Sequence, residues 1–485
     1  MAGLESFDPA TGARLGVVPR TPPGGVRAAA DEARRVQPFW AALPLADRAR
    51  YLRRTARVVV SDLDALTDLL AREQGRPRTE AMLMEILASV DALRWMAREG
   101  PAALGDQRLR TRQAPLRGKR SRVTHEPLGV VGVAAPWPSP WASGLRRVAL
   151  ALMAGNGVVL HAADLAPVVS SRIATALGRA GVPAGLVQVV AGAVADAELD
   201  ASGLDRVVRV EGGGRDPMLV LADATASHAA GGAVWAAFSN AGQSRGNVGR
   251  AIVRREVAGR FVEAVVERAN RLRVGDPRRW DTDVGPLAGP DQLERVMAVV
   301  DEAVAEGARR HCGGPVRVPG LAGSFLAPVV LTGVTPDMRV VGEEVPGPVL
   351  PIISVAGDEE AIAVAAAGAP SVGASVWTGD RDRGAQIARA LRAERTWIND
   401  HMLNALSPAG FDEVAAARLR VSGPTRPSRL RDLWWYPYDD SLAGTARAAA
   451  RYLYGREEDR LRALREGRRP ALRLARRLAR DAVRG

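Results

Sequence analysis

The feature that most constrains the fold of this 485-residue chain is a regular alternation of strand and helix patterns between residues 129 and 191. Short apolar runs rich in valine alternate with longer segments whose apolar residues recur at helical spacing. The predicted elements, in order, are strand Gly129–Ala135, helix Trp141–Ala154, strand Gly157–His161, helix Pro167–Ala180 and strand Val187–Ala191. Strands that alternate with helices form parallel βαβ units, so we expect a doubly wound, Rossmann-like sheet.

The ends of these strands are the first place to look for a site, because ligands of such sheets bind beyond the carboxyl ends of the strands. The residues there are Pro136–Pro140, His161–Asp164 and Ala191–Ala193. No G-x-G-x-x-G fingerprint and no P-loop occurs in this half of the chain. The motifs by themselves therefore do not predict a bound nucleotide.

A second α/β region is expected from Glu211 to Asp400. Within it, Phe238–Arg250 is a polar, glycine-bearing segment between a helix of small residues and a strand. Loops of this composition present backbone N–H groups and side chains to a pocket. We therefore expect Phe238–Arg250 to line the functional site.

The composition excludes several kinds of site. The single cysteine, Cys312, rules out an intrachain disulfide and a cysteine-rich metal site, and the five histidines lack zinc-binding spacing, so no metal is predicted. No apolar run approaches the roughly 18 residues that span a bilayer. The first residues show no signal-peptide pattern, so we expect a cytoplasmic protein.

The net charge of +13 is concentrated at the C-terminus, because residues 441–485 contain 13 arginines and only five acidic residues. We expect a basic amphipathic helix from about Thr445 to Arg484 that either contacts an anionic membrane or acidic partner, or packs on its own protein. Its predicted apolar face consists of Leu461, Leu464, Leu472, Ala475 and Leu478. The basic segment 104–125 is expected to be an exposed hairpin, and it lacks the interleaved aromatic residues of a nucleic-acid site, so no nucleic-acid partner is predicted.

The order of short motifs over residues 5 to about 435 resembles the NAD(P)-dependent aldehyde dehydrogenase superfamily. The matching stretches are Asp8–Gly12, Glu126–Val133, Met153–Asn156, Asn240–Gln243, Gly275–Pro277, Asp283–Leu287, Glu343–Val349 and Ile398–Asp400. The resemblance implies an aldehyde dehydrogenase-like α/β fold with a Rossmann-like cofactor domain, an α/β catalytic domain and a small β oligomerisation arm.

The resemblance also implies a domain organisation. The helical part of the cofactor domain takes residues 1–103, an oligomerisation hairpin 104–125, and a truncated Rossmann-like domain 126–210. The catalytic-type domain takes 211–402, an oligomerisation strand with an aromatic linker 403–440, and the basic helix 441–485. Within the linker region, Leu419–Val421 is the segment that such a protein uses to cross to a neighbouring subunit.

The reaction of this family needs a cysteine thiolate that attacks the aldehyde, donors that stabilise the oxyanion, and a glutamate that activates water. The resemblance places Glu211 at the general-base position and the nucleophile two residues after Gln243, where this chain has Arg245. A guanidinium is always protonated and is no nucleophile. The oxyanion asparagine corresponds to Pro138, which has no N–H donor. Both positions are expected to be non-functional.

The positions that the resemblance assigns to the cofactor are Trp137, His161, Asp164 and Glu344. His161 and Asp164 stand where the family has a lysine and a glutamate on the cofactor ribose. The phosphate-contacting G-S-T-x-x-G segment expected after Val190 is absent, and Pro346 replaces an aromatic residue near the nicotinamide. We therefore expect no tight binding of NAD or NADP, the cofactors of the family.

Three functions remain open on the sequence. The first is a catalytically inactive family member that forms a homodimer or a hetero-oligomer with an active aldehyde dehydrogenase homologue. The second is an altered NAD(P)-dependent chemistry on aldehydes or acyl groups through Ser244 and Glu211. The third is a scaffold recruited to a membrane or acidic partner by residues 441–485.

Overall fold

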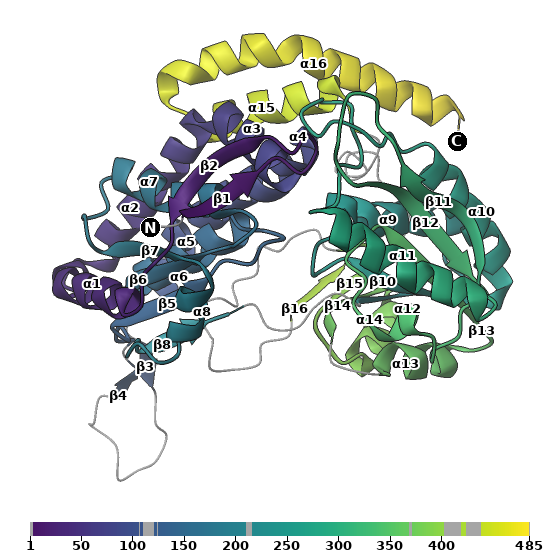
Figure 1. Cartoon of the computed structure of the whole chain (residues 1–485), viewed down its shortest axis with the longest axis horizontal. Helices are drawn as coiled ribbons and strands as arrows, with labels where there is room; N and C mark the ends of the chain where they lie inside the picture. Colours follow the sequence, from purple (N-terminus) through teal and green to yellow (C-terminus); the bar gives the residue numbers. More distant parts are fainter. Residues whose placement is uncertain are drawn as a thin grey trace.

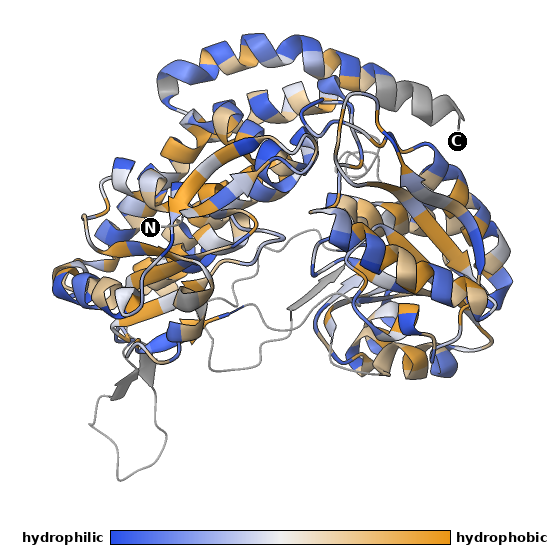
Figure 2. Ribbon diagram, viewed as in Figure 1, coloured by the Kyte–Doolittle hydropathy of each residue, from blue (hydrophilic) through white to orange (hydrophobic). Residues whose placement is uncertain are grey.

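The computed structural model describes residues 3–105, 107–109, 121–123, 125–209, 216–367, 371–401, 419–422 and 438–484. Figure 1 shows two sheets side by side, each covered by helices, with the C-terminal helices lying along one side of both halves. In Figure 2 the strands of both sheets are largely hydrophobic and the surrounding helices are mixed, as expected for sheets buried on both faces.

The first sheet contains the predicted βαβ units and has the strand order β7-β6-β5-β8, all parallel. Its strands are β5 (Val130–Ala134), β6 (Gly157–Ala162), β7 (Val187–Ala191) and β8 (Arg206–Val208). The helices that follow β5, β6 and β7 are α6 (Ala142–Ala154), α7 (Pro167–Arg179) and the short α8 (Ala193–Glu198). Every residue of β6 is buried, which explains why its sequence is apolar except for His161.

Helices from the N-terminal part of the chain lie beside this sheet; the first packs on its strands, and most of the others pack on α6 or α7. They are α1 (Gly25–Ala41), α2 (Leu45–Ser61), α3 (Leu63–Gln74), α4 (Arg78–Glu80) and α5 (Ala88–Ala103). The helical pattern from Thr79 to Arg98 predicts one α-helix, and this prediction is wrong in one respect, because residues Ala81–Leu87 form a π-helical segment, η1. Such segments are rare and occur often at functional sites. A hairpin of β1 (Gly3–Phe7) and β2 (Arg14–Pro19) encloses the predicted turn at Asp8–Gly12.

The second sheet has eight strands in the order β11-β12-β13-β10-β9-β14-β15-β16. These are β9 (Asp216–Val220), β10 (Val248–Arg254), β11 (Arg309–Val316), β12 (Phe325–Thr332), β13 (Val349–Val355), β14 (Ser371–Trp377), β15 (Ala393–Ile398) and β16 (Leu419–Ser422). Only β11 and β12 pair antiparallel within it. Its helices are α9 (Ala226–Phe238), α10 (Arg255–Asn270), α11 (Pro290–Ala305), α12 (Arg339–Gly342), α13 (Asp358–Ala366) and α14 (Arg381–Ala390).

The segments expected to mediate oligomerisation form small β elements. In the predicted arm, β3 (Gln107–Leu109) pairs antiparallel with β4 (Ser121–Val123). The strand β16 pairs parallel with β15 of the same chain. Pairing of Leu419–Val421 with a neighbouring subunit remains a prediction.

The C-terminal region is not the single helix predicted from Thr445 to Arg484. It forms two helices, α15 (Asp440–Tyr454) and α16 (Glu457–Arg484), which pack on each other. The break lies at Gly455, where a Cβ atom would stand 2.3 Å from the carbonyl oxygen of Arg451. Acidic residues then occupy the first turn of α16, where the helix dipole favours negative charge.

The face that α16 buries also differs from the predicted apolar face. Ala463 and Leu474 are buried, whereas Leu461, Leu464 and Leu472 are 71%, 52% and 50% exposed. Figure 2 accordingly shows α16 as hydrophilic along most of its described length. Among the described helices, none is long and apolar enough to cross a membrane.

The helix pair α15–α16 is called the C-terminal hairpin below. It begins next to a residue that is buried in the core. Tyr438 is fully buried, and its hydroxyl accepts a hydrogen bond of 2.9 Å from the indole N–H of Trp235 on α9. Arg447 and Arg451 of α15 form ion pairs of 2.7 and 2.8 Å with Asp64 of α3. The hairpin therefore joins helices of the first half of the chain to the second half.

Candidate functional site

The loop that follows α9 has a strained backbone. Asn240 and Ala241 both have φ of 51° and Gly242 has φ of 71°, so three consecutive residues lie in the left-handed region. Alanine has no side-chain group that compensates for this conformation, which costs on the order of 1–2 kcal/mol. Strain of this kind persists where the surroundings fix the backbone, and it clusters at functional sites.

Close packing and the side chain of Gln243 hold this loop in place. A Cβ atom at Gly242 would lie 2.0 Å from the carbonyl oxygen of Gly347, so only glycine permits this approach of the two backbones. The amide of Gln243 donates to the carbonyl of Asn240 at 3.0 Å and accepts from the N–H of Ala288 at 2.9 Å. Gln243 is therefore a structural residue of the loop.

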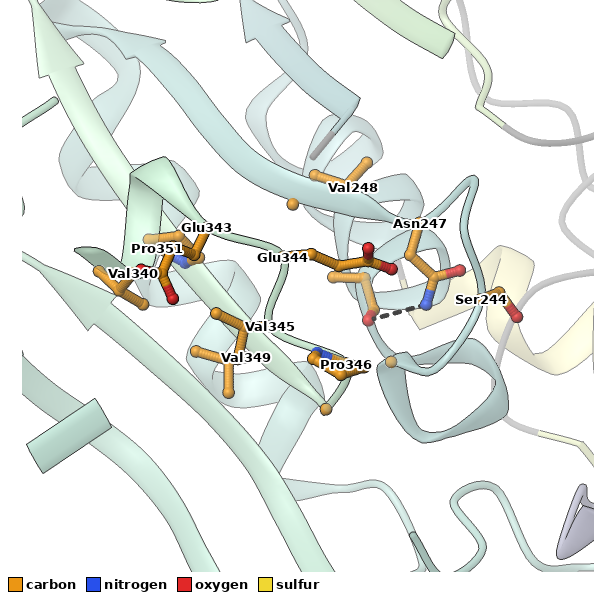
Figure 3. Close-up of a pocket in the computed structure, with 14 residues that line it drawn as sticks. Ser244, Asn247, Val248, Val340, Glu343, Glu344, Val345, Pro346, Val349 and Pro351 are labelled. Atoms are coloured by element: carbon orange, nitrogen blue, oxygen red, sulfur yellow. Dashed lines mark hydrogen bonds between the residues drawn. The ribbon is translucent and has the colours of Figure 1, made fainter. Parts of the chain in front are cut away.

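A narrow pocket lies between this loop and the segment Glu343–Pro351 (Figure 3). It is lined by Ser244 and Asn247 on one side and by Glu344 and Pro346 on the other. Its volume is about 10 Å³, which is room for about one water molecule. The amide of Asn247 donates to the carbonyls of Ala237 and Ser239 at 3.3 and 3.0 Å, and so closes the inner wall of the pocket.

A buried ionic cluster connects this loop to the first sheet. Arg76 lies between two carboxylates, with its guanidinium 2.6 Å from Glu80 and 3.6 Å from Glu85. The other carboxylate oxygen of Glu80 accepts from the backbone N–H of Asn240 at 2.9 Å. All three charged side chains are 4% exposed or less. The cluster therefore fixes the start of the strained loop from the side of η1.

The same arginine also holds the loop that follows β5. Its guanidinium donates to the carbonyl of Pro138 at 2.6 Å, and Gln74 donates to the carbonyl of Trp137 at 2.8 Å. The loop after β5 and the loop after α9 are thus joined through one ion pair, Arg76–Glu80. Figure 1 shows that these loops come from different sheets.

Burial governs the protonation of the two acids. Desolvation raises the pKa of Glu80 and of Glu85, and the guanidinium of Arg76 opposes this shift in both. Glu85 also accepts from the backbone N–H of Ala142, the first residue of α6, at 2.7 Å. Because one guanidinium faces two desolvated carboxylates, removing it would leave both without their cationic partner.

His401 supports the far end of the loop. Its Nε2 lies 3.0 Å from the carbonyl of Gly246, which accepts, so Nδ1 is the acceptor for the hydroxyl of Ser375 at 2.9 Å. Burial lowers the pKa of His401 to about 4. The ring is therefore neutral near neutral pH, with both nitrogens engaged.

The carboxyl edge of the first sheet carries the residues predicted to contact a cofactor ribose. His161 is buried, with Nε2 3.2 Å from the carbonyl of Gly192, and Asp164 is exposed. Two buried carboxylates occupy the helix N-termini at this edge. Glu73 accepts from the backbone N–H groups of Val168 and Val169 of α7 at 2.8 and 2.6 Å, and Glu85 caps α6.

The structure brings some of the predicted site residues together. Ser244 and Glu344 line one pocket, and Pro138 is linked to the same loop through Arg76 and Glu80. Arg245 is partly exposed on this loop. His161 and Asp164 lie at the edge of the other sheet, and Glu211 is outside the described residues. Among the residues that the structure describes, no group of acidic, histidine or cysteine side chains could hold a metal ion.

Sequence reasoning missed Arg76, Glu80, Glu85 and His401. One signal was available, because Glu80 and Glu85 interrupt an otherwise apolar run, and charged residues are fully buried almost only when they are paired. Nothing in the local sequence of His401 indicates its contact with Gly246, which lies 155 positions away.

Comparison with known proteins identifies the family. The sequence model of the aldehyde dehydrogenase family matches residues 2–200 and 194–412 of this chain. A betaine aldehyde dehydrogenase from Cereibacter sphaeroides is 32% identical over 420 residues, which cover 81% of this chain and 85% of that relative.

Solved structures agree with this match. An aldehyde dehydrogenase from Bacillus cereus, determined as an NAD+ complex, has a TM-score of 0.77 and 29% identity, covering 83% of this chain and 86% of that one. Succinate-semialdehyde dehydrogenase from Burkholderia pseudomallei has a TM-score of 0.76 and 30% identity, covering 83% and 87%. The predicted aldehyde dehydrogenase-like α/β fold is thus confirmed.

The first prediction concerns the ionic cluster. We expect Arg76→Met to lower the free energy of unfolding by roughly 3–5 kcal/mol, because it leaves two buried carboxylates without their cation. Arg260→Met, at an exposed position of α10, is the matched control and should change it by about 0.5 kcal/mol or less. Urea unfolding measures both. Equal stabilities of the two variants would show that the cluster does not hold the site loops.

Proposed function

This chain belongs to the aldehyde dehydrogenase family, and we propose that it keeps the fold of the family but has lost the thiolate chemistry. The observation that carries this proposal is the residue at the nucleophile position. Arg245 stands two residues after Gln243 on the strained loop, and a guanidinium cannot attack an aldehyde.

The only cysteine does not replace the missing nucleophile. Cys312 lies in β11, three strands from β10 in the sheet order, which corresponds to a separation of roughly 14 Å. Its thiol donates to the carbonyl of Pro328 at 3.4 Å, and burial raises its pKa. A reactive thiol needs the opposite shift, because the thiolate is the nucleophile.

Among the described residues, the hydroxyl of Ser244 forms no hydrogen bond with a histidine or a carboxylate, although Glu344 lines the same pocket. His401 is close to the loop, but both of its ring nitrogens are engaged, with Gly246 and Ser375, and it is fully buried. A serine nucleophile needs a base that can take its proton. This arrangement disfavours an altered NAD(P)-dependent chemistry on aldehydes or acyl groups through Ser244 and Glu211. That chemistry remains the alternative function.

Oxyanion stabilisation is weakened as well. Pro138 stands at the position of the family asparagine and has no N–H to donate, and its carbonyl is tied to Arg76. Loss of one oxyanion donor lowers kcat by about 10² to 10³. Together with the missing nucleophile, this supports negligible aldehyde oxidation by the chain alone.

The described residues also fit the cofactor poorly. A dinucleotide phosphate normally sits at a helix N-terminus beyond the strand ends. Here Glu73 and Glu85 occupy the N-termini of α7 and α6, and α8 is only six residues long. Carboxylates at these positions repel phosphate. We therefore propose that NAD and NADP bind weakly or not at all, with Trp137, His161, Asp164 and Glu344 as vestigial cofactor positions.

A chain that keeps the fold of the family but lacks its catalytic residues fits the role of a non-catalytic subunit. We propose that this cytoplasmic chain pairs with an active, cysteine-bearing aldehyde dehydrogenase homologue through the β3–β4 arm and β16. Affinity purification from the native cell should recover that homologue. Recovery of a homo-oligomer alone would contradict the pairing.

The loss of activity has a direct test. We expect the purified protein, incubated with a panel of aldehydes and NAD+ or NADP+, to form no more NAD(P)H than its Glu211→Ala variant. Glu211 is the informative residue because it is the intact member of the family machinery. NAD(P)H formation that disappears in Glu211→Ala would overturn the proposal and favour residual aldehyde chemistry.

A further inference from the structure

A groove lined by arginines lies away from the candidate site, between α2, the end of α7 and the C-terminal hairpin. Its volume is about 750 Å³, and a second hollow of about 500 Å³ along α2 shares Arg54 and Arg57 with it. The outer wall consists of α15 and α16, so the groove exists because the hairpin covers α2. Figure 1 shows these helices on the same side of the molecule.

The charge of this groove is strongly positive. Six arginines line it, against the two acidic residues Asp459 and Glu466. Glu466 is already shared by Arg451 and Arg462, at 2.9 and 2.8 Å. Arg179 and Arg451 also pair with Asp62 and Asp64 beside the groove. Among the described residues, this leaves Arg54 and Arg57 without an acidic partner.

Several of these arginines have hydrogen-bond donors to spare. Arg57 forms no hydrogen bond or ion pair with any residue that the structure describes. Arg54 lies over the ring of Tyr51 at 4.0 Å, a contact that leaves its N–H edge available. Arg456 has only a contact of 3.7 Å with Glu458, in which both side chains are 75% exposed. Such a surface pair contributes little.

The arrangement on α2 is unfavourable without a ligand. Arg50, Arg53, Arg54 and Arg57 are exposed and lie mostly three or four residues apart, so they share one face of the helix. Asp47 pairs with Arg50 at 2.7 Å, and Arg53 donates to the carbonyl of Ala97 at 3.1 Å, so Arg54 and Arg57 are the arginines that an anion would pair with first. Like-charge pairs at this spacing destabilise a helix. An anion along this face would remove the repulsion.

We propose that this groove binds an anion with several phosphoryl groups. The guanidinium fork matches phosphate oxygens in bidentate geometry. The arginines of α2 extend over roughly 10 Å of helix, from seven residues at 1.5 Å each. This length fits a chain of phosphoryl groups better than a single phosphate. A ligand bound here contacts α2 and the hairpin together, and so holds the hairpin on the first half of the chain.

Calorimetry with tripolyphosphate and the full-length protein tests the site. We expect saturable binding at low salt that weakens as salt rises. In the double variant Arg54→Gln and Arg57→Gln it should be at least about 10-fold weaker, since charged hydrogen bonds contribute about 1.5–3 kcal/mol each. Arg260→Gln, an exposed arginine of α10, is the control and should bind as the wild type does.

Two further measurements make the outcome decisive. Thermal unfolding without ligand should occur at no lower temperature in the double variant than in the control, because the substituted side chains are exposed and their loss relieves repulsion on α2. Vesicles that contain a polyphosphorylated inositol lipid distinguish a lipid headgroup from a soluble ligand. If tripolyphosphate or these vesicles bind to the wild-type protein and no longer bind to the double variant, the result supports a phosphate-binding site in the groove. No binding, or equal binding by the double variant and Arg260→Gln, would overturn it.

Discussion

The buried pairing of Arg76 with Glu80 and Glu85 is the interaction on which the candidate site depends. It lies between two sheets that the chain builds from separate segments, and it binds one loop from each. Arg76 holds the carbonyl of Pro138, and Glu80 holds the N–H of Asn240. Removing three charged groups from water is costly, so they remain buried only because each also bonds to backbone or to another charge. The π-helical segment η1 begins directly after Glu80 and carries Glu85.

This arrangement is compatible with the proposed loss of the thiolate chemistry from an otherwise intact fold. The residues that fix the loop, among them Gln243, Asn247 and His401, do not belong to the thiolate reaction, so replacement of the nucleophile leaves them in place. The left-handed Ala241 still carries its strain. In an active enzyme such strain positions a nucleophile, whereas here it positions Arg245.

The sequence predicted the first parallel sheet well because its central strands are buried on both faces and appear as short valine-rich runs, as in Val130–Ala134. It did not predict the β11–β12 pair, where glycines and a proline in Arg309–Val316 hide the strand pattern and two bulges interrupt the register. The break at Gly455 was missed because both flanking segments are helical, although the following acidic residues mark a new helix start. The loop 238–250 was correctly predicted to line a pocket, but its contacts with Glu80 and His401 join residues more than a hundred positions apart in the sequence.

We propose that the fold of an aldehyde dehydrogenase is intact in this chain while its nucleotide and nucleophile positions are disabled. Titration of the purified protein with NAD+ in a calorimeter tests it most directly, because Glu73 and Glu85 already occupy the helix N-termini that a dinucleotide phosphate would need. If this proposal holds, the titration gives no heat beyond that of dilution. A saturable heat of binding at one site per chain would contradict it.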